Sequence, residues 1–146
     1  MAGSLVSIAG WLDGYLTAQN ETREKTFDLV PWQNTELLLS ALGSWCRTRP
    51  QDTLHTAAFR LVESLASMRL TERSPQLAVG SGAAAIHLYA AVIERIQQRL
   101  KMRGMYAGEP GGEFDAATAD ALRRFQREKK LPETGLPDQL TLANLL

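Results

Sequence analysis

Residues 100–126, LKMRGMYAGEPGGEFDAATADALRRFQ, contain the strongest pattern in the chain. A glycine-rich segment from Gly104 to Glu113 separates two segments with apolar residues at three- and four-residue spacing, which predicts two helices joined by a turn. Gly104 stands where the first helix ends, a position that commonly needs positive φ. Asp115 is expected to cap the second helix, over residues 116–130, with Thr118 at its third position.

The segments on either side extend this helical pattern. Upstream, one apolar stripe predicts a long helix over residues 83–103; its members are Ile86, Tyr89, Ile93, Ile96 and Leu100. Downstream, Leu131, Pro132 and Gly135 predict a turn, and Pro137 or Asp138 opens a last short helix. Phe114 and Phe125 are expected to meet in the core. The side-chain amide of Gln126 is expected to bond to loop carbonyls.

The first half of the chain predicts three more helices. They cover residues 4–18, residues 35–48 with Asn34 as N-cap, and a segment from Asp52 or Thr53 to about residue 70. Gly10 and Gly14 share a face of the first helix, which indicates either a second backbone packed closely there or a solvent-facing strip. Residues 71–82, with Pro75, two glycines and two serines, read as a linker.

These elements predict an all-α protein of two small helical modules, each of about three helices. The expected divisions are a helical domain over residues 1–70, a short Pro/Gly/Ser linker over 71–82, and a three-helix module over 83–146. A length of 146 residues is compatible with two small domains.

Composition excludes several classes of function. The chain has 16 Lys and Arg against 16 Asp and Glu, so it lacks the basic footprint of a nucleic-acid binder. Its one cysteine, Cys46, cannot form an internal disulfide or a cysteine-rich zinc site. Its two histidines, His55 and His87, fall in different modules with no ligand spacing around them. We therefore expect no metal, no cofactor and no enzymatic activity.

Two features bear on the compartment. No apolar run approaches the roughly 20 residues that a membrane-spanning helix needs. The first residues, MAGSLV, lack the positive region and cleavage site of a signal peptide. Either the chain starts at Met1 and stays inside the cell, or a longer precursor has been trimmed, in which case the expected location is the periplasm.

The stretch from residue 93 to residue 146 resembles the peptidoglycan-binding domain family, a three-helix module found beside cell-wall hydrolases. The matching residues are Leu100, Gly104, Tyr106, Gly108, Gly112, Phe114, Thr118, Ala121, Leu122, Phe125, Gln126, Thr134, Gly135, Thr141 and Leu142. The departure is Asp115, where the family often has glycine. The resemblance implies that this module binds peptidoglycan and does no chemistry. It also implies a groove beside the first turn and the second helix, with four candidate ligand-binding residues: Tyr106, Asp115, Arg124 and Gln126.

The first half is similar to the HdeA-like group of small periplasmic helical proteins and to related immunity proteins of type VI secretion. The resemblance rests on Trp11, Leu12, Gly14, Tyr15, Leu16, Ala18, Asn20, Trp45, Cys46 and Pro50. Members usually have two cysteines; Cys46 matches the second, and this chain lacks the first. The resemblance implies that the N-terminal module binds a protein partner or client.

Together these features predict a non-catalytic cell-envelope protein that binds peptidoglycan through one module and a protein partner through the other. Three alternatives stay open: an immunity or inhibitor protein against a wall-degrading enzyme, the targeting part of a cell-wall hydrolase, and a wall-binding fold reused for protein contacts inside the cell. The basic cluster of Arg123, Arg124, Arg127, Lys129 and Lys130 ends a helix, where cations offset the helix dipole. It would also attract anionic wall polymers.

Overall fold

The computed structural model describes residues 2–82 and 85–146, and it divides the chain into two compact units. We call the part up to Arg73 the N-terminal unit and Ser74–Leu146 the C-terminal unit. Both units are mainly helical within the described residues, which confirms the predicted fold class. The exception is a small two-stranded sheet in the C-terminal unit.

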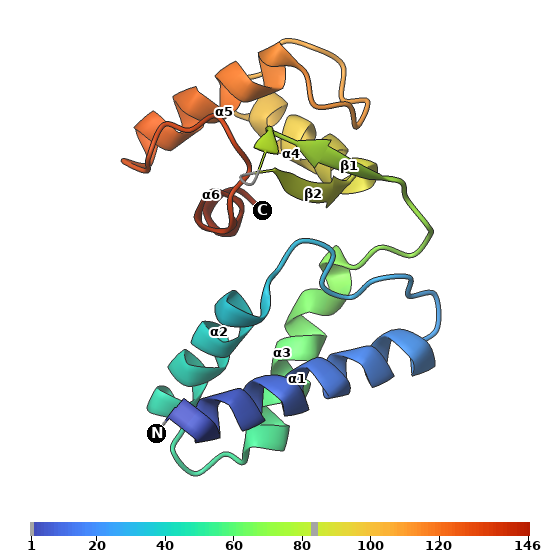
Figure 1. Cartoon of the computed structure of the whole chain (residues 1–146), viewed down its shortest axis with the longest axis vertical. Coiled ribbons are helices and arrows are strands. Elements are labelled where there is room, and N and C mark those ends of the chain that lie inside the picture. Colours follow the sequence, from blue (N-terminus) through green and yellow to red (C-terminus); the bar gives the residue numbers. More distant parts are fainter. Residues whose placement is uncertain (1, 83–84) are drawn as a thin grey trace. The chain divides into compact units, whose positions relative to one another are not determined.

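Three helices build the N-terminal unit (Figure 1): α1 (Ala2–Thr22), α2 (Thr35–Thr48) and α3 (Leu54–Leu65), with a short 3-10 turn (Ala66–Met68) after α3. Helix α2 begins at the predicted cap, because the Asn34 side chain accepts a hydrogen bond from the Leu37 N–H at 2.9 Å. Thr53 caps α3 in the same way. Both caps satisfy backbone donors that a helix leaves unpaired at its first turn.

The core of the N-terminal unit lies among the three helices. Its fully buried side chains include Leu12 from α1, Leu29 from the following loop, and Ala58 and Val62 from α3. Gly10 and Gly14 face open space, since a Cβ built at either position would meet no other atom within 4 Å. The solvent-facing interpretation of these glycines is therefore the right one.

A loop of residues 23–34 connects α1 to α2 and is held firmly. The backbone of Asp28 pairs with that of Leu70 in an isolated antiparallel bridge, with bonds of 2.7 and 3.2 Å. At the other side of the loop, the Asn20 side chain accepts a hydrogen bond from the Leu29 N–H at 2.9 Å. The loop therefore has a defined shape although it contains no regular structure.

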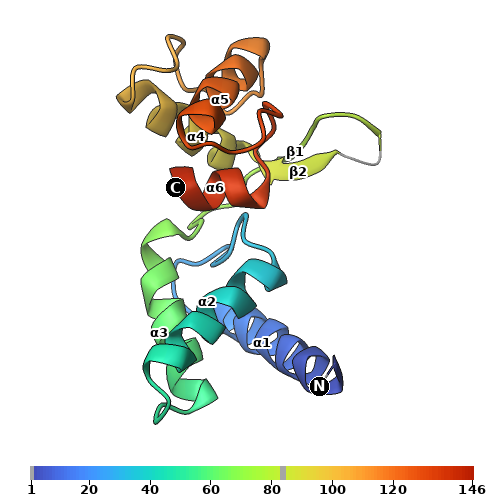
Figure 2. The same cartoon turned by 90° about the vertical axis from the view of Figure 1, so that its left-hand side faces the viewer.

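The C-terminal unit contains the hairpin β1 (Gln76–Val79) and β2 (Ile86–Tyr89), followed by α4 (Ala90–Met102), α5 (Ala116–Glu128) and α6 (Gln139–Leu145). Helix α4 packs against α5, α6 and β2 (Figure 2). Its buried side chains Ile93, Ile96 and Leu100 meet a core that includes Leu122 and Phe125 of α5. Asp115 caps α5 as expected, and Asp138, one of the two residues expected to open the last helix, caps α6.

The hairpin corrects two predictions. Residues 76–79 of the expected linker are a strand, and Ile86–Tyr89 of the expected 83–103 helix are its partner, in the register Gln76 to Tyr89 and Val79 to Ile86. Ala83 and Ala84, where that helix was expected to begin, lie outside the described residues. The two residues before β1 accept hydrogen bonds from the first turn of α4. The N–H of Ala90 donates to the carbonyl of Pro75 at 2.8 Å, and the N–H of Ala91 donates to Ser74 Oγ at 3.0 Å. The backbone before residue 90 is therefore used for strand pairing.

Among the described helices, none combines the length and the apolar character needed to cross a membrane.

Candidate binding site on the C-terminal unit

The segment from Gly104 to Glu113, which we call the turn after α4, begins at a glycine with positive φ. Gly104 has φ of 70°, as the sequence predicted, and its N–H donates to the carbonyl of Lys101 at 2.9 Å. The N–H of Met105 reaches back to the carbonyl of Leu100 at 2.9 Å. This pair of bonds terminates the helix and turns the chain toward α5.

Tyr106 lies on the inner side of this turn. Its side chain is 6% exposed, so only a small part of the ring reaches the surface. Gly108 packs against the phenol: a Cβ at Gly108 would lie 2.6 Å from the Tyr106 hydroxyl oxygen. Tyr106 and Gly108, which both belong to the residues that resemble the peptidoglycan-binding domain family, therefore contact each other. Because Gly108 has no side chain, it leaves room for the ring of Tyr106.

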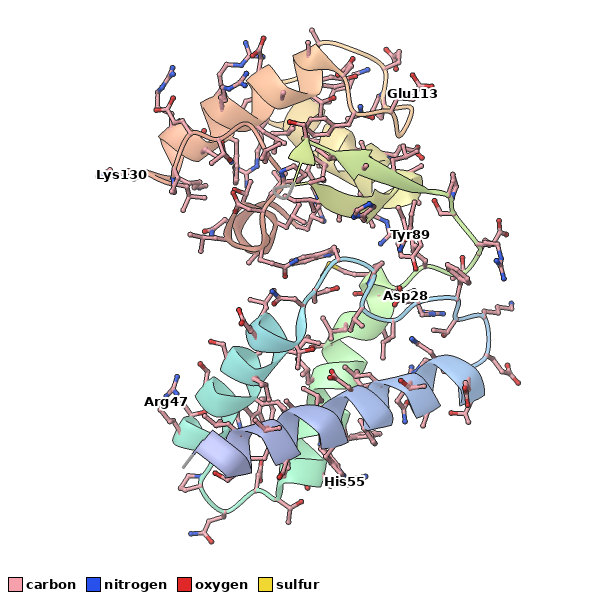
Figure 3. The ribbon with its side chains drawn as sticks, in the orientation of Figure 1. Asp28, Arg47, His55, Tyr89, Glu113 and Lys130 are labelled. Carbon is pink, nitrogen blue, oxygen red and sulfur yellow. The ribbon has the colours of Figure 1, made fainter. Side chains whose placement is uncertain are left out.

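A glutamine that the sequence analysis did not single out holds the rest of the turn. Gln97, 1% exposed on α4, accepts hydrogen bonds from the N–H groups of Gly111 and Gly112 at 2.9 and 3.1 Å. Its Nε2 donates to the carbonyl of Glu113 at 2.7 Å and to Thr118 Oγ1 at 2.9 Å. The turn is thus bound to α4 through one buried amide. Glu113 lies at the α5 end of this turn (Figure 3).

Asp115 occupies the start of α5. Its Oδ1 accepts hydrogen bonds from the Thr118 N–H at 2.7 Å and from the Thr118 hydroxyl at 2.5 Å. These two bonds favour the carboxylate, so the pKa of Asp115 lies below its ordinary value, with the hydroxyl bond as the larger cause. Asp115 is exposed, yet its principal contacts are with its own helix.

Arg124 joins α5 to the turn. It is exposed, and its guanidinium donates a hydrogen bond to the carbonyl of Met105. Other members of the basic cluster are paired with carboxylates. Arg127 binds Glu133 through two nitrogens at 2.7 to 3.1 Å, which lowers the pKa of that carboxyl, and Arg123 binds Asp120 at 2.6 Å.

Gln126 has no exposed area, so it cannot contribute directly to a surface groove. Its Nε2 lies 3.0 Å from the carbonyl of Leu136 and 3.0 Å from the hydroxyls of Thr134 and Thr141. Its Oε1 accepts from the Gly135 N–H at 2.8 Å. The expectation that this amide bonds to loop carbonyls is confirmed, and its role as a candidate ligand contact is corrected to that of a loop anchor.

The four candidates therefore differ in what they offer a ligand. Asp115 and Arg124 are exposed, Tyr106 is almost fully buried, and Gln126 supports the fold from within. Tyr106 and Arg124 contact residues of the turn without any ligand present, whereas Asp115 bonds to Thr118 of its own helix. That they line a groove stays a prediction.

None of the residues considered for other chemistry belongs to this turn. His55 is exposed at the start of α3 (Figure 3), and His87 is exposed on β2. Cys46 is a half-buried free thiol on α2. Within residues 2–82 and 85–146, no three His, Cys, Asp or Glu side chains gather where they would hold a metal ion.

Comparison with known proteins gives a family match in the C-terminal region. Residues 90–145 match the model of the family described as "Putative peptidoglycan binding domain". This match covers α4, α5, α6 and the turn just described, and it agrees with the resemblance seen in the sequence. Neither the comparison with curated proteins nor that with solved structures returned a match.

Proposed function

We propose that the C-terminal unit attaches this protein to the cell wall by binding peptidoglycan without cleaving it. The observation that carries the proposal is the family match over residues 90–145, which includes each loop anchor of the unit. A wall-binding role places the protein in the cell envelope, and we propose the periplasm as the compartment.

The turn after α4 is the part of the unit best suited to contact the polymer. It is fixed by Gln97 from one side and by Arg124 from the other, so little ordering would be needed on binding. Peptidoglycan presents sugar hydroxyls, amides and carboxylates. An exposed guanidinium donates to such oxygens, and Arg is the side chain best suited to a carboxylate because of its planar fork of donors.

Sedimentation with purified sacculi tests the proposal. The full chain is expected to pellet with intact sacculi and to stay in solution when the sacculi are digested to soluble fragments beforehand. If the chain stays in solution with intact sacculi as well as with digested sacculi, the proposal is contradicted. Release of muropeptides by the chain alone would contradict its non-catalytic part.

Arg124→Ala gives the residue-level test. The variant is expected to pellet several-fold less than the parent, because it loses the exposed donor beside the turn. Arg60→Ala is the matched control, since Arg60 is an exposed arginine of α3 in the other unit. Equal loss in both variants would show that net charge alone holds the protein to the wall.

For the N-terminal unit we propose contact with a protein partner or client. Supporting this are large apolar side chains that α1 and α3 leave exposed: Leu5 at 60%, Val6 at 73%, Trp11 at 39% and Phe59 at 45%. The chain is expected to reduce the light scattering of a denatured client protein, and Val6→Glu is expected to weaken that effect. Unchanged scattering with the parent chain would contradict this part.

A further inference from the structure

The outer edge of strand β1 presents backbone groups that the hairpin itself does not use. The sheet has two strands, so β1 has β2 on one side and an edge on the other. Figure 2 shows the strands extending beyond the helices of their unit. The family match begins at residue 90, so the hairpin precedes the matched domain, and the turn proposed for wall contact does not include it.

The register of the hairpin decides which backbone groups face this edge. In an antiparallel pair, opposite residues alternate between pairs that exchange two backbone hydrogen bonds and pairs that exchange none. The Ala90 N–H donates to the carbonyl of Pro75 at 2.8 Å, in the same register as the strands, so residues 75 and 90 are in bonding phase. The backbone groups of Leu77 and Val79 share this phase, and they therefore bond to β2.

Gln76 and Ala78 have the opposite phase, so their N–H and C=O groups point away from β2. Both residues are exposed. Among residues 2–82 and 85–146, no backbone hydrogen bond outside the helices and the hairpin involves either of them. Such an edge is a template for another strand, because a strand lying beside it would supply partners for all four groups.

The hairpin lacks the charges that usually keep an exposed edge from pairing. Residues 74–93 contain no Lys, Arg, Asp or Glu, although charged residues make up 22% of the chain. Proteins commonly protect an edge strand with charged side chains, proline or a bulge. Here Pro75 stands just before β1, and the register continues through β1 without a bulge. Two copies of β1 would therefore meet without charge repulsion.

The outward groups are symmetric about Leu77, which makes the edge complementary to itself. If a second β1 lies antiparallel with the two Leu77 residues opposite each other, Gln76 of each copy faces Ala78 of the other. Each of these two pairs exchanges two backbone bonds, so every outward group of the strand has a partner. Centring the pair on Gln76 or on Ala78 would instead set some of these groups opposite residues outside the strand. Leu77 is half-buried in one copy, and its counterpart would cover it further.

We propose that β1 pairs antiparallel with β1 of a second copy of this chain, with the two-fold axis at Leu77. The result is a four-stranded sheet in the order β2, β1, β1, β2. A strand of four residues buries much less than the roughly 800 Å² per partner of a standard interface, so the pair exchanges with single copies and forms in concentrated protein. The proposal does not rest on the wall-binding function.

Hydrogen exchange at two protein concentrations tests the pairing on the unaltered chain. In a single copy the amides of Gln76 and Ala78 face solvent and exchange quickly, whereas those of Leu77 and Val79 are held by β2. Millimolar protein is expected to slow the exchange of Gln76 and Ala78 several-fold relative to dilute protein, with little change at Leu77 and Val79. Exchange at Gln76 and Ala78 that is independent of concentration would overturn the proposal.

Cysteine pairs test the register. Cys46, the one cysteine of the chain, is first replaced by serine, and chains with Gln76→Cys are then mixed and oxidised with chains carrying Ala78→Cys. In the proposed register these positions lie opposite each other, with Cα atoms about 5.5 Å apart, which suits a disulfide. Two copies of the same variant would place their Cα atoms about 9 Å apart, beyond disulfide range.

The mixture is therefore expected to form its disulfide several-fold faster than either variant alone. Equal rates in the three samples would overturn the proposal. Both positions are exposed, so these substitutions leave the core intact.

Ala78→Pro removes one outward N–H and leaves the bonds to β2 in place, since proline is tolerated on the free side of an edge strand. This variant is expected to lose the concentration-dependent protection of Gln76, and the matched control Ala78→Ser, which keeps the N–H, is expected to retain it. Protection that persists in Ala78→Pro would contradict the pairing. If Ala78→Pro fails to fold, the cysteine mixture decides.

Discussion

Gln97 on α4 and Gln126 on α5 hold the loops that follow these two helices in the same way. Both side chains are buried, and each Oε1 accepts from a glycine N–H, Gly112 at 3.1 Å and Gly135 at 2.8 Å. Each Nε2 donates to a backbone carbonyl of the same loop. Both glycines have positive φ, 77° and 69°. The shape of each loop therefore depends on one helix-borne amide and one left-handed glycine.

Replacing the second of these amides is expected to destabilise the C-terminal unit selectively. Gln126→Leu leaves the Gly135 N–H and the Leu136 carbonyl unpaired in the interior, at a cost of about 2–4 kcal/mol in the free energy of unfolding. The measurement is unfolding in urea, monitored through the hydrogen exchange of the α5 amides.

Two controls accompany this variant. Gln98→Leu changes an exposed glutamine of α4 and is expected to stay within about 0.5 kcal/mol of the parent. Trp11, Trp32 and Trp45 all lie in the N-terminal unit, so tryptophan fluorescence reports that unit separately. Similar stabilities for the two glutamine variants would contradict the anchoring role of Gln126.

Gly108 is expected to tolerate no side chain. Gly108→Ala would place a Cβ 2.6 Å from the Tyr106 hydroxyl oxygen, and the displaced ring should cost about 1–3 kcal/mol. Gly111→Ala is the matched variant, since the nearest atom to its Cβ is 3.9 Å away. Thermal unfolding followed by far-UV circular dichroism compares the two. Equal melting temperatures would show that the contact between Gly108 and Tyr106 is not tight.

Asp115 should make the stability of the C-terminal unit depend on acid. Its pKa is lowered in the folded state by the bonds from Thr118, so the unfolded chain takes up the proton first as the pH falls. The stabilisation is present above the ordinary Asp pKa of about 3.9 and is lost as the pH drops through the lower folded value. Asp115→Ala is expected to cost about 1 kcal/mol at pH 7 and much less once the pH has fallen below the lowered pKa of Asp115.

Asp115→Asn is the control for the charge. Asparagine is also a good N-cap, so this variant should retain most of the stability at pH 7 and lose the acid dependence of this site. Urea midpoints measured at intervals from pH 7 to pH 2 give the comparison. An Asp115→Ala deficit that stays constant across this range would contradict the assignment.

The starts of α2, α5 and α6 could be predicted from the sequence because their causes are local. Asn34, Asp115 and Asp138 each cap a helix through a bond to an N–H three residues later. The end of α4 at Gly104 could be predicted for the same reason, because Gly104 follows an apolar stripe and glycine is free to adopt positive φ. Such signals depend on a few consecutive residues and on no distant contact.

The hairpin was missed because its second strand continues the spacing of the next helix. Ile86, Tyr89 and Ile93 step by three and four, as on one helix face, although residues 86–89 also alternate as a strand does. Pairing with residues 76–79 decided between the two patterns. That pairing depends on residues seven to thirteen positions away along the chain, which periodicity alone does not reveal.

The site features that the sequence did not predict depend on tertiary contacts. Gln97 lies beside Ile96 on α4, and its role follows only from the return of residues 111–113 to this helix. Gln126 was recognised as a loop anchor, yet its complete burial followed only from the packing of the loop and α6 over it.

A titration of the full 15N-labelled chain with soluble peptidoglycan fragments tests the wall-binding claim most directly. The account predicts saturable shifts of the amides in residues 103–113 and at the start of α5, reduced in Arg124→Ala and retained in Arg60→Ala. Unchanged amide signals in the C-terminal unit at saturating fragment would contradict it.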